Sequence, residues 1–288
     1  SLVDAYPSAT AQCSLRFPFR TGTDDATQYD HDGGWLPIHF AAKFAHQEEI
    51  VRAILHATLK LNPDTHQAPA TKKGLTPLHL ALCNTRCNTD QRTSIVQTLL
   101  ESYTDTGIVQ QKTLAGWYPL HVALACNASV EGNNKLLASI STSNTVTSAE
   151  GLGLLHLALQ GRCTLEIVAK VLDTCDVQRK DHAGRTALHA GVMFAAPHEC
   201  IELVLRSFPG ALAVKDIHGM TPLHQALQGR CSERTIGLLL DESLLLSGTL
   251  IDTPVGWCTS NGRSCLHLAA RFKATSTEIV QKILSADP

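Results

Sequence analysis

The chain has 288 residues and a formal net charge of −2, and its Lys and Arg are spread along its length, which excludes the basic footprint of a nucleic-acid binder. No apolar run approaches the ~18–20 residues that cross a bilayer, so we expect no membrane insertion. The ten cysteines are too dispersed for a disulfide scaffold and indicate reduced thiols in a protein of the cytoplasm or the nucleus.

A repeated pattern occupies the chain from about residue 30 to its end. Its first column is a histidine that follows an aliphatic residue, at His39, His79, His121, His156, His189, His224 and His267. The second column is a glycine five residues earlier, at Gly34, Gly74, Gly116, Gly151, Gly184, Gly219 and Gly262. A small residue stands two positions after each histidine, at Ala41, Ala81, Ala123, Ala158, Gly191, Ala226 and Ala269. Three columns that agree in every unit establish an internal repeat.

The columns divide the chain into repeats with boundaries near 30–70, 71–112, 113–147, 148–180, 181–215, 216–258 and 259–288. Residues 1–29 precede the first repeat, and Leu2–Pro7 is similar to Leu205–Pro209, which ends a predicted helix. We therefore expect residues 1–29 to contain the tail of a preceding repeat and a linker. We also expect the chain to be a fragment of a longer repeat protein, because no polar capping repeat is evident at either end.

Each repeat contains the signals for a turn and two helices. The glycine supplies the positive φ of a tight turn. Thr76-Pro77 and Thr221-Pro222 place a capping hydroxyl before a proline at the first helical position, so a first helix, helix A, begins there. A second helix, helix B, is marked by paired aliphatic residues at helical spacing, such as Ile95, Val96, Leu99 and Leu100. Because one such pair cannot bury both apolar faces alone, the units must stack into an all-α solenoid.

The length of the repeat varies. Consecutive repeat histidines are between 33 residues apart (His156 to His189) and 43 residues apart (His224 to His267). We assign the surplus to predicted loops at Leu59–Thr71, Cys83–Thr93, Cys126–Asn134 and Asp241–Ser260. Insertions in such loops leave a stack of repeats intact.

These units resemble the ankyrin-repeat family. The sequences G-L-T-P-L-H-L-A at 74–81 and G-M-T-P-L-H-Q-A at 219–226 carry the clearest likeness, whereas the units at Gly151 and Gly262 lack both the Thr and the Pro. The resemblance implies an ankyrin-repeat solenoid of about seven turn–helix–helix units in a curved array. It also implies that the repeat histidines form hydrogen bonds within and between repeats, and that partners dock on the concave side formed by the turns and helix A.

The sequence ALQGRC occurs twice, at 158–163 and 226–231, and raises the question of a reactive thiol. We favour Cys163 and Cys231 as small buried hydrophobic residues. In the alternative interpretation, Arg162 or Arg230 lowers the pKa of a reactive thiol, but no motif supplies a base and an orienting acid. The spacing of the other cysteines does not match zinc sites. We expect no catalytic residue, no cofactor and no metal.

The candidates for partner binding lie at the turns and at the exposed end of helix A. Trp, Met and Arg are enriched at protein interfaces, and several of these positions hold them. The set is Trp35, Lys72, Lys73, Trp117, Arg185, Met193, Phe194, His218, Met220, Arg263, Arg271 and Phe272. The alternative is that its aromatic residues and Met193 pack within and between repeats, and that its charged residues are only solvated.

The sequence favours a non-catalytic scaffold that binds an unidentified protein partner through the concave face, as a monomer. A second hypothesis makes this segment the regulatory or targeting arm of a larger enzyme or membrane protein whose active part lies outside these residues. A third hypothesis is a thiol-dependent enzyme that uses Cys163 or Cys231.

Overall fold

The computed structural model of the chain describes residues 34–61, 68–103, 107–127, 136, 151–228, 231–246, 258–271 and 276–286. Within these ranges the regular elements are helices, and the β pairing consists of one isolated bridge between Lys180 and Thr186. The all-α prediction is therefore confirmed. Residues 1–29, where we predicted the tail of a preceding repeat, lie outside the described ranges. No helix of the described residues is long and apolar enough to cross a bilayer.

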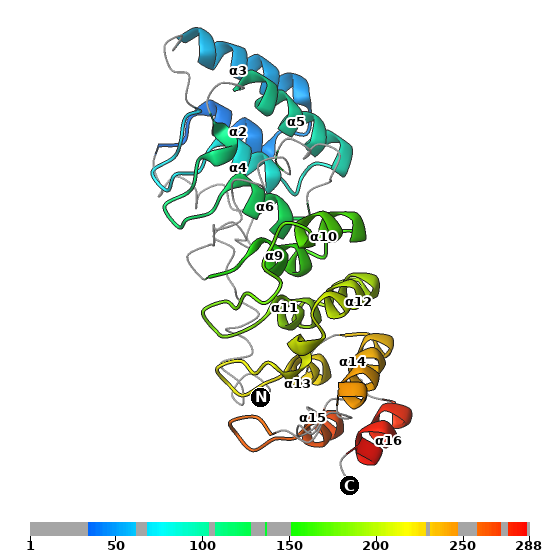
Figure 1. Ribbon diagram of the computed structural model, residues 1–288. Helices are drawn as coiled ribbons and strands as arrows, with labels where there is room; N and C mark the ends of the chain where they lie inside the picture. The colour runs from blue at the N-terminus through cyan, green and yellow to red at the C-terminus, as the bar shows by residue number, and fades with distance from the viewer. Residues whose placement is uncertain are drawn as a thin grey trace.

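Two rows of helices form the body of the solenoid (Figure 1). Helix A of successive repeats is α2 (Pro37–Phe44), α4 (Pro77–Leu82), α6 (Pro119–Ala125), α9 (Leu154–Gln160), α11 (Ala187–Met193), α13 (Pro222–Gln228) and α15 (Cys265–Arg271). Helix B is α3 (Glu48–Leu61), α5 (Thr89–Ser102), α10 (Leu165–Leu172), α12 (His198–Ser207), α14 (Glu233–Leu246) and α16 (Thr277–Ala286). In the third repeat, the described residues also include the buried helical residue Leu136. Each A helix contacts the A helix of the next repeat, and α3 with α5, and α10, α12, α14 and α16 in order, do the same in the B row.

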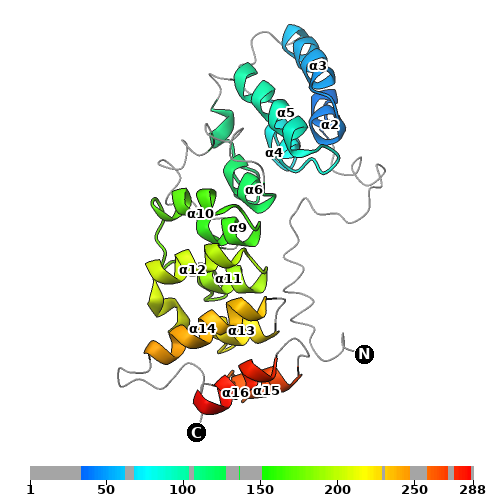
Figure 2. The same ribbon diagram turned by 90° about the vertical axis from the view of Figure 1, so that its right-hand side faces the viewer.

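The repeats follow one another in chain order, from α2 and α3 at one end to α15 and α16 at the other (Figures 1 and 2). The turns project to one side of the A row, on the left in Figure 1, and the B helices of the later repeats lie on the right. Two short 3₁₀ helices, η3 (Ile108–Gln110) and η5 (Pro209–Ala213), lie between a B helix and the following turn. The molecule therefore has a turn side and an outer side formed by the B helices.

The inner A helices are enclosed by the neighbouring A helices and the rest of their repeat, whereas α2 and α15 at the two ends of the described stack bury only part of their residues. All six residues of α4 and all seven residues of α9 are buried. The B helices bury one face, which in α5 includes the predicted Ile95, Val96, Leu99 and Leu100. In α3, by contrast, Ile50 is 46% exposed, because no earlier B helix of the described residues packs against it. Stacking, and not the single unit, therefore completes the core.

Helix A begins where the capping signals predict it. Oγ1 of Thr76 accepts a hydrogen bond from the His79 backbone N–H, and Pro77 is the first residue of α4. In α9, which lacks these signals, the N-cap is Gly153 without a side-chain cap. All the turn glycines of the predicted column have a positive φ, between 69° and 85°. Only glycine adopts this backbone region without strain, which explains its place in every unit.

Three predicted loops are shorter than the sequence indicated, so their boundaries were wrong. α5 begins at Thr89 and includes Thr93, because the Asn88 side chain accepts the Gln91 N–H (2.8 Å) and caps the helix earlier. α3 continues to Leu61, and α14 continues through Asp241 to Leu246. The polar, solvent-facing positions of a B helix have the composition of a loop, which misled the sequence-based boundary. Most of the predicted loop after Cys126 lies outside the described residues.

Gly161 is a point of close approach between two repeats. It is the C-cap of α9, and a Cβ at this position would lie 1.9 Å from the carbonyl oxygen of Leu124 in α6. Its φ of −74° is accessible to any residue, so the short distance alone requires glycine here. Gly237 in α14 offers a comparison, because a Cβ there meets nothing within 4 Å.

We predict that Gly161→Ala lowers the free energy of unfolding by about 1–3 kcal/mol, because the two A helices must move apart. The matched variant Gly237→Ala should raise it by about 0.5–1 kcal/mol, because alanine is the better residue inside a helix. Urea unfolding followed by far-UV circular dichroism measures both. Equal effects of the two substitutions would contradict the close approach.

Candidate functional site

The repeat histidines connect each A helix to the next turn. Nδ1 accepts the backbone N–H of the residue three positions earlier, at 2.9–3.3 Å, in His39, His79, His121, His189, His224 and His267. On the other side of the ring, Nε2 donates to a backbone carbonyl of the following repeat. The accepting residues are Trp117 for His79 (3.1 Å), Arg185 for His156 (2.9 Å) and Met220 for His189 (3.1 Å). This is the arrangement that the family resemblance implies.

These hydrogen bonds require the neutral form of the ring. A backbone N–H can only donate and a carbonyl can only accept, so Nδ1 must be bare and Nε2 must carry the proton. Burial lowers the pKa of His79 and of His189 to about 4, and the carbonyls of Trp117 and Met220 oppose this only in part. Burial also lowers the pKa of His39 and of His156. His79 and His189 are therefore structural groups that do not take up a proton near neutrality.

A further column holds the turn in place in five of the repeats. Three residues before the turn glycine stands a Thr or an Asp, at Thr71, Thr113, Asp181, Asp216 and Thr259. Its side chain accepts the N–H of the residue just after the glycine, at 2.9–3.2 Å. Its backbone N–H donates to the carbonyl of that same residue at 2.9 Å. This Thr or Asp column was not predicted, although an alignment of the units on their turn glycines reveals it.

The Asp of the fifth repeat also binds a buried arginine. Oδ2 of Asp181 accepts Nε (2.8 Å) and Nη2 (2.7 Å) of Arg185, and both residues are buried. Nη1 of Arg185 lies 3.8 Å from the sulfur of Met193. Removing one partner of such a pair leaves a buried charge, which costs about 3–5 kcal/mol. The pair therefore belongs to the framework of the turn.

Neighbouring turns are hydrogen-bonded to one another. The Leu114 N–H donates to the Lys73 carbonyl (3.0 Å), and the Ile217 N–H donates to the Ala183 carbonyl (3.0 Å). In the same way, the Ser260 N–H donates to the His218 carbonyl (2.9 Å). All of these residues belong to what we term the tip pair, the two residues directly before each turn glycine. The described tip pairs are Lys72-Lys73, Leu114-Ala115, His182-Ala183, Ile217-His218 and Ser260-Asn261.

The cysteines cap helices of the preceding repeat. The thiol of Cys163 donates to the Leu124 carbonyl (3.2 Å), and the thiol of Cys231 donates to the Val192 carbonyl (2.9 Å). Cys87 makes the equivalent bond to Ala45 (2.9 Å). Burial raises the pKa of both Cys163 and Cys231 to about 12. This is the opposite of the lowered pKa that a reactive thiol needs.

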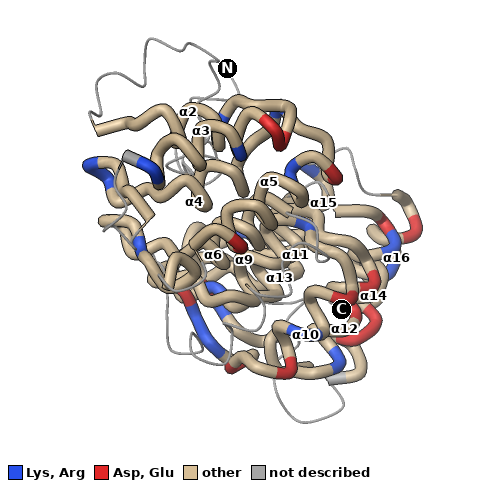
Figure 3. Tube along the Cα trace, turned by 90° about the horizontal axis from the view of Figure 1, so that it is seen from above, with Lys and Arg blue, Asp and Glu red and all other residues tan. Residues whose placement is uncertain are grey.

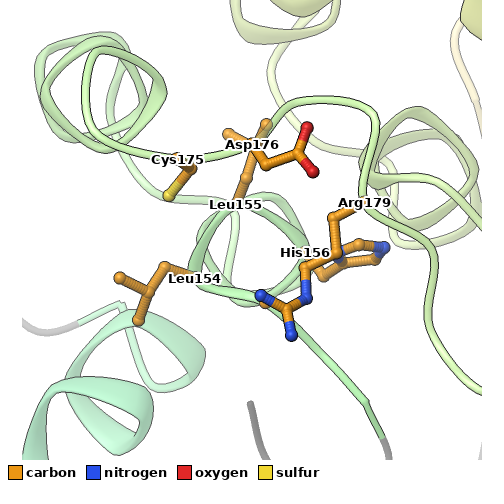
Figure 4. Close-up of a pocket in the computed structure, with 7 residues that line it drawn as sticks. Leu154, Leu155, His156, Cys175, Asp176 and Arg179 are labelled. Atoms are coloured by element: carbon orange, nitrogen blue, oxygen red, sulfur yellow. The ribbon is translucent and has the colours of Figure 1, made fainter. Parts of the chain in front are cut away.

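A small pocket lies beside the repeat histidine of α9. Figure 4 shows His156 and Arg179 together on one side of it and Cys175 on the other. Its cavity of about 10 Å³ is near the lower limit for one water molecule. Nε2 of His156 is already engaged with the Arg185 carbonyl. The pocket therefore has no room for a substrate, and Nε2 of His156 is not available to one. Within the described residues, no cluster of three His, Cys, Asp or Glu side chains could hold a metal ion.

The predicted partner-binding residues fall into two groups. Trp117 (5% exposed) and Arg185 (9% exposed) are buried. The Trp117 ring lies edge-on to the His121 ring, with 6.1 Å between the ring centroids. Trp117 and Arg185 offer little surface, so their role in binding stays a prediction that the burial does not favour. The half-buried members are Trp35, Met193, Phe194, His218, Met220 and Arg263, and the exposed members are Lys72, Lys73 and Arg271. Phe272 lies outside the described residues.

The structure places together only some of these residues. Trp35 packs against Phe40 (5.0 Å between ring centroids) at the α2 end, far along the stack from Arg271 at the end of α15 (Figure 1). Arg185 and Met193 lie side by side in one repeat. Two exposed aliphatic residues at the turns were not in the predicted set: Leu114, which is 82% exposed, and Ile217, which is 66% exposed. They occupy the same position of the turn as the predicted Lys72.

The turn column, the bridging histidines and the stacked A and B helices define the ankyrin-repeat solenoid. Among solved structures, the chain is similar to the crystal structure of the ankyrin repeat domain of Bcl-3, described as a unique member of the IkappaB protein family. The TM-score is 0.54 at 21% sequence identity, and the match covers 88% of this chain and 99% of that chain. No family model and no curated protein sequence matches the chain. The fold predicted from the repeat motifs is confirmed.

We predict that the protein loses stability as the pH falls from 7 to 5. The folded-state pKa of about 4 for His79 and His189 lies below the ordinary 6.5, so protons bind the unfolded chain first. The stability that the neutral rings contribute is present above pH ~6.5 and decreases below it, by roughly 2 kcal/mol for each ring at pH ~5. Urea unfolding at both pH values measures the loss. His189→Gln should reduce the loss and the exposed-site control His182→Gln should not; equal losses in both variants would refute this account.

We predict that Cys163 and Cys231 react slowly with iodoacetamide at neutral pH in the folded protein. Both are buried thiols with a pKa raised to about 12, so little thiolate is present and access is poor. The exposed Cys258 is the internal control and should be alkylated first. Mass spectrometry of peptides over time measures each site. Alkylation of Cys163 or Cys231 as fast as Cys258 would restore the hypothesis of a reactive thiol.

Proposed function

We propose that this chain is a non-catalytic scaffold that binds a partner protein through its turn side. The observation that carries the proposal is that some turn residues are hydrogen-bonded inside the repeat, whereas others face outward. The glycine, the Thr or Asp column and the histidine are used inside the repeat, whereas the tip pairs face outward and differ from repeat to repeat. A row of variable side chains on a constant frame is suited to the recognition of an extended partner surface.

The other observations at the site agree with binding in preference to catalysis. Cys163 and Cys231, the cysteines of the two ALQGRC copies, donate hydrogen bonds to helix carbonyls. Burial raises the pKa of each thiol to about 12. His79 and His189 are occupied on both ring nitrogens. A general base or a nucleophile needs an available atom at the site of reaction, and these residues do not provide one.

The solenoid also offers exposed groups of the kind that proteins recognise. Lys72 and Lys73 are exposed on the second turn, and Leu114 and Ile217 expose most of their aliphatic surface. Met193 and Met220 are half-buried and belong to neighbouring repeats. The partner surface proposed from the sequence therefore becomes more specific: it consists of the tip pairs together with the exposed ends of the A helices. The second hypothesis, a regulatory or targeting arm of a larger enzyme or membrane protein, needs the same binding of a partner through the turn side.

The test is a binding comparison between two faces of the whole chain. The 288-residue protein is immobilised, incubated with cell lysate, and its retained proteins are quantified by mass spectrometry. The turn-side variant Lys72→Ser/His218→Ser is compared with the outer-side control Lys60→Ser/Arg234→Ser. Trp117 is unsuitable as a probe because its replacement would remove buried core area.

We predict that the retained partners fall about tenfold on the turn-side variant and stay within about twofold on the control, because tip residues in a partner contact carry more of the binding free energy. Circular dichroism verifies that both variants are folded. Partners that survive the turn-side changes and disappear with the outer-side changes would place the binding face on the B helices and overturn the proposal.

A further inference from the structure

Charge is unevenly distributed between the two sides of the solenoid. In Figure 3 the edge formed by the early turns is mostly blue, whereas red is concentrated around α12, α14 and α16. The basic residues of the turn regions are Lys72, Lys73, Lys112, Arg179, Lys180, Arg185, Lys215 and Arg263. The outer helices carry more acidic than basic residues: the acids are Glu48, Glu49, Asp90, Glu101, Glu166, Glu199, Glu202, Glu233, Asp241, Glu242 and Glu278, and the bases are Arg52, Lys60, Arg92, Lys170, Arg206, Arg234 and Lys282. An overall charge of −2 therefore conceals a basic turn side.

The two acidic residues of the turn column, Asp181 and Asp216, do not cancel this charge at the surface. Oδ1 of Asp181 and Oδ1 of Asp216 each accept two backbone N–H groups of their own turn, at 2.8–2.9 Å. Both carboxylates are buried, and Asp181 is also neutralised by Arg185. The exposed lysines Lys112 and Lys180, each four residues before a turn glycine, thus face solvent, while the carboxylates of Asp181 and Asp216 bind backbone amides of their own turns.

Two exposed aliphatic side chains occupy equivalent positions of the tip pairs. Leu114 is 82% exposed and Ile217 is 66% exposed, and each is the first residue of its tip pair. The hydrogen bonds between turns keep such positions in line: Leu114 lies beside Lys73, and Ile217 lies beside Ala183. The ring of His182 in turn lies against the Gly151 turn, where an added Cβ would be 2.6 Å from its Cδ2.

The spacing of the two aliphatic residues defines a length. Leu114 and Ile217 are three repeats apart, and neighbouring packed helices are about 8–10 Å apart, so the two positions are about 24–30 Å apart. An extended chain covers this distance with about seven to nine residues at about 3.3 Å each. The basic Lys112, Lys180 and Lys215 lie along the same interval of the stack.

We propose that the tips bind an extended, acidic segment of a partner protein that carries two apolar side chains about seven to nine residues apart, one on Leu114 and one on Ile217. The inference deepens the proposed function by naming the chemistry of the partner. Its carboxylates face the exposed turn lysines Lys112, Lys180 and Lys215, while its apolar side chains cover the exposed aliphatic surface. A single-stranded nucleic acid also carries negative charge, but it needs aromatic platforms for its bases. The exposed large apolar groups of the tips are aliphatic, and Trp117 is buried, so the structure favours the peptide.

The experiment measures the binding of a defined peptide by fluorescence anisotropy. The probe is a fluorescein-labelled, Glu-rich peptide with two leucines about eight residues apart, which matches the spacing of the tips. Its controls are a peptide of the same composition with adjacent leucines, and a peptide with Gln in place of Glu. A thymidine oligonucleotide serves as the competing polyanion. The protein is the whole chain in each case.

The variants separate the charge from the apolar contact. Lys112→Glu/Lys180→Glu should weaken binding about tenfold, because two attractive contacts become repulsive. Leu114→Ser/Ile217→Ser should also weaken it about tenfold, because the partner's apolar side chains lose their contact area. The matched control Lys60→Glu/Arg234→Glu makes the same change in net charge on exposed residues of α3 and α14 and should change binding less than about twofold.

Three results would overturn the inference: no binding of the spaced peptide, equal binding of the peptide with adjacent leucines, or an equal loss in the turn-lysine and outer-side charge variants. Preferential binding of the oligonucleotide would equally exclude an acidic protein segment. These outcomes are distinguishable from a failure of the proposed function. If lysate partners are still lost on the turn-side variant while the peptide does not bind, the scaffold role stands and the acidic, two-point partner does not.

Discussion

The structure depends on one hydrogen-bonding group, the neutral imidazole of the repeat histidine. Nδ1 of His79 accepts the amide of Thr76, and its Nε2 donates to the carbonyl of Trp117 in the next turn. Both backbone groups are buried, so leaving either without a partner would cost about 1–3 kcal/mol. Because equivalent bonds recur at His189, successive turns adopt the same position relative to their A helices. The regular stack of turns follows from this.

The same arrangement separates the residues that build the turn from those that face outward. Asp181 and Asp216 are charged residues in surface turns, yet their carboxylates are taken up by backbone amides of those turns. The residues of the tip pairs are not needed for this, and so a lysine, a leucine, a histidine or an isoleucine is accepted there. The internal use of the acids is also what leaves the turn side basic in a chain that is slightly acidic overall. Framework and surface chemistry are thus two consequences of one set of hydrogen bonds.

Particular residues show which features of the fold and of the candidate site could be predicted from the sequence. The turn glycines, the start of helix A at Pro77 and the aliphatic face of α5 were predicted because they depend on local backbone geometry and helical periodicity. The start of α5 was placed too late, because the cap at Asn88 precedes a polar stretch that has the composition of a loop. Trp117 and Arg185 were assigned to the partner-binding surface from their residue types, but a Trp is as well suited to a core and an Arg can be buried with Asp181.

The sequence by itself determined the repeat, its helices and the column of bridging histidines, because three agreeing columns and capping signals are local properties that each unit carries in full. Only the tertiary structure decided which turn residues are buried and which are available to a partner. Leu114 and Trp117 are three residues apart on one turn, yet one is 82% exposed and the other 5%. The physical reason is that exposure depends on how the folded turn packs: the Trp117 ring lies edge-on to His121 of α6, whereas Leu114 bonds to the neighbouring turn through its backbone and leaves its side chain in solvent.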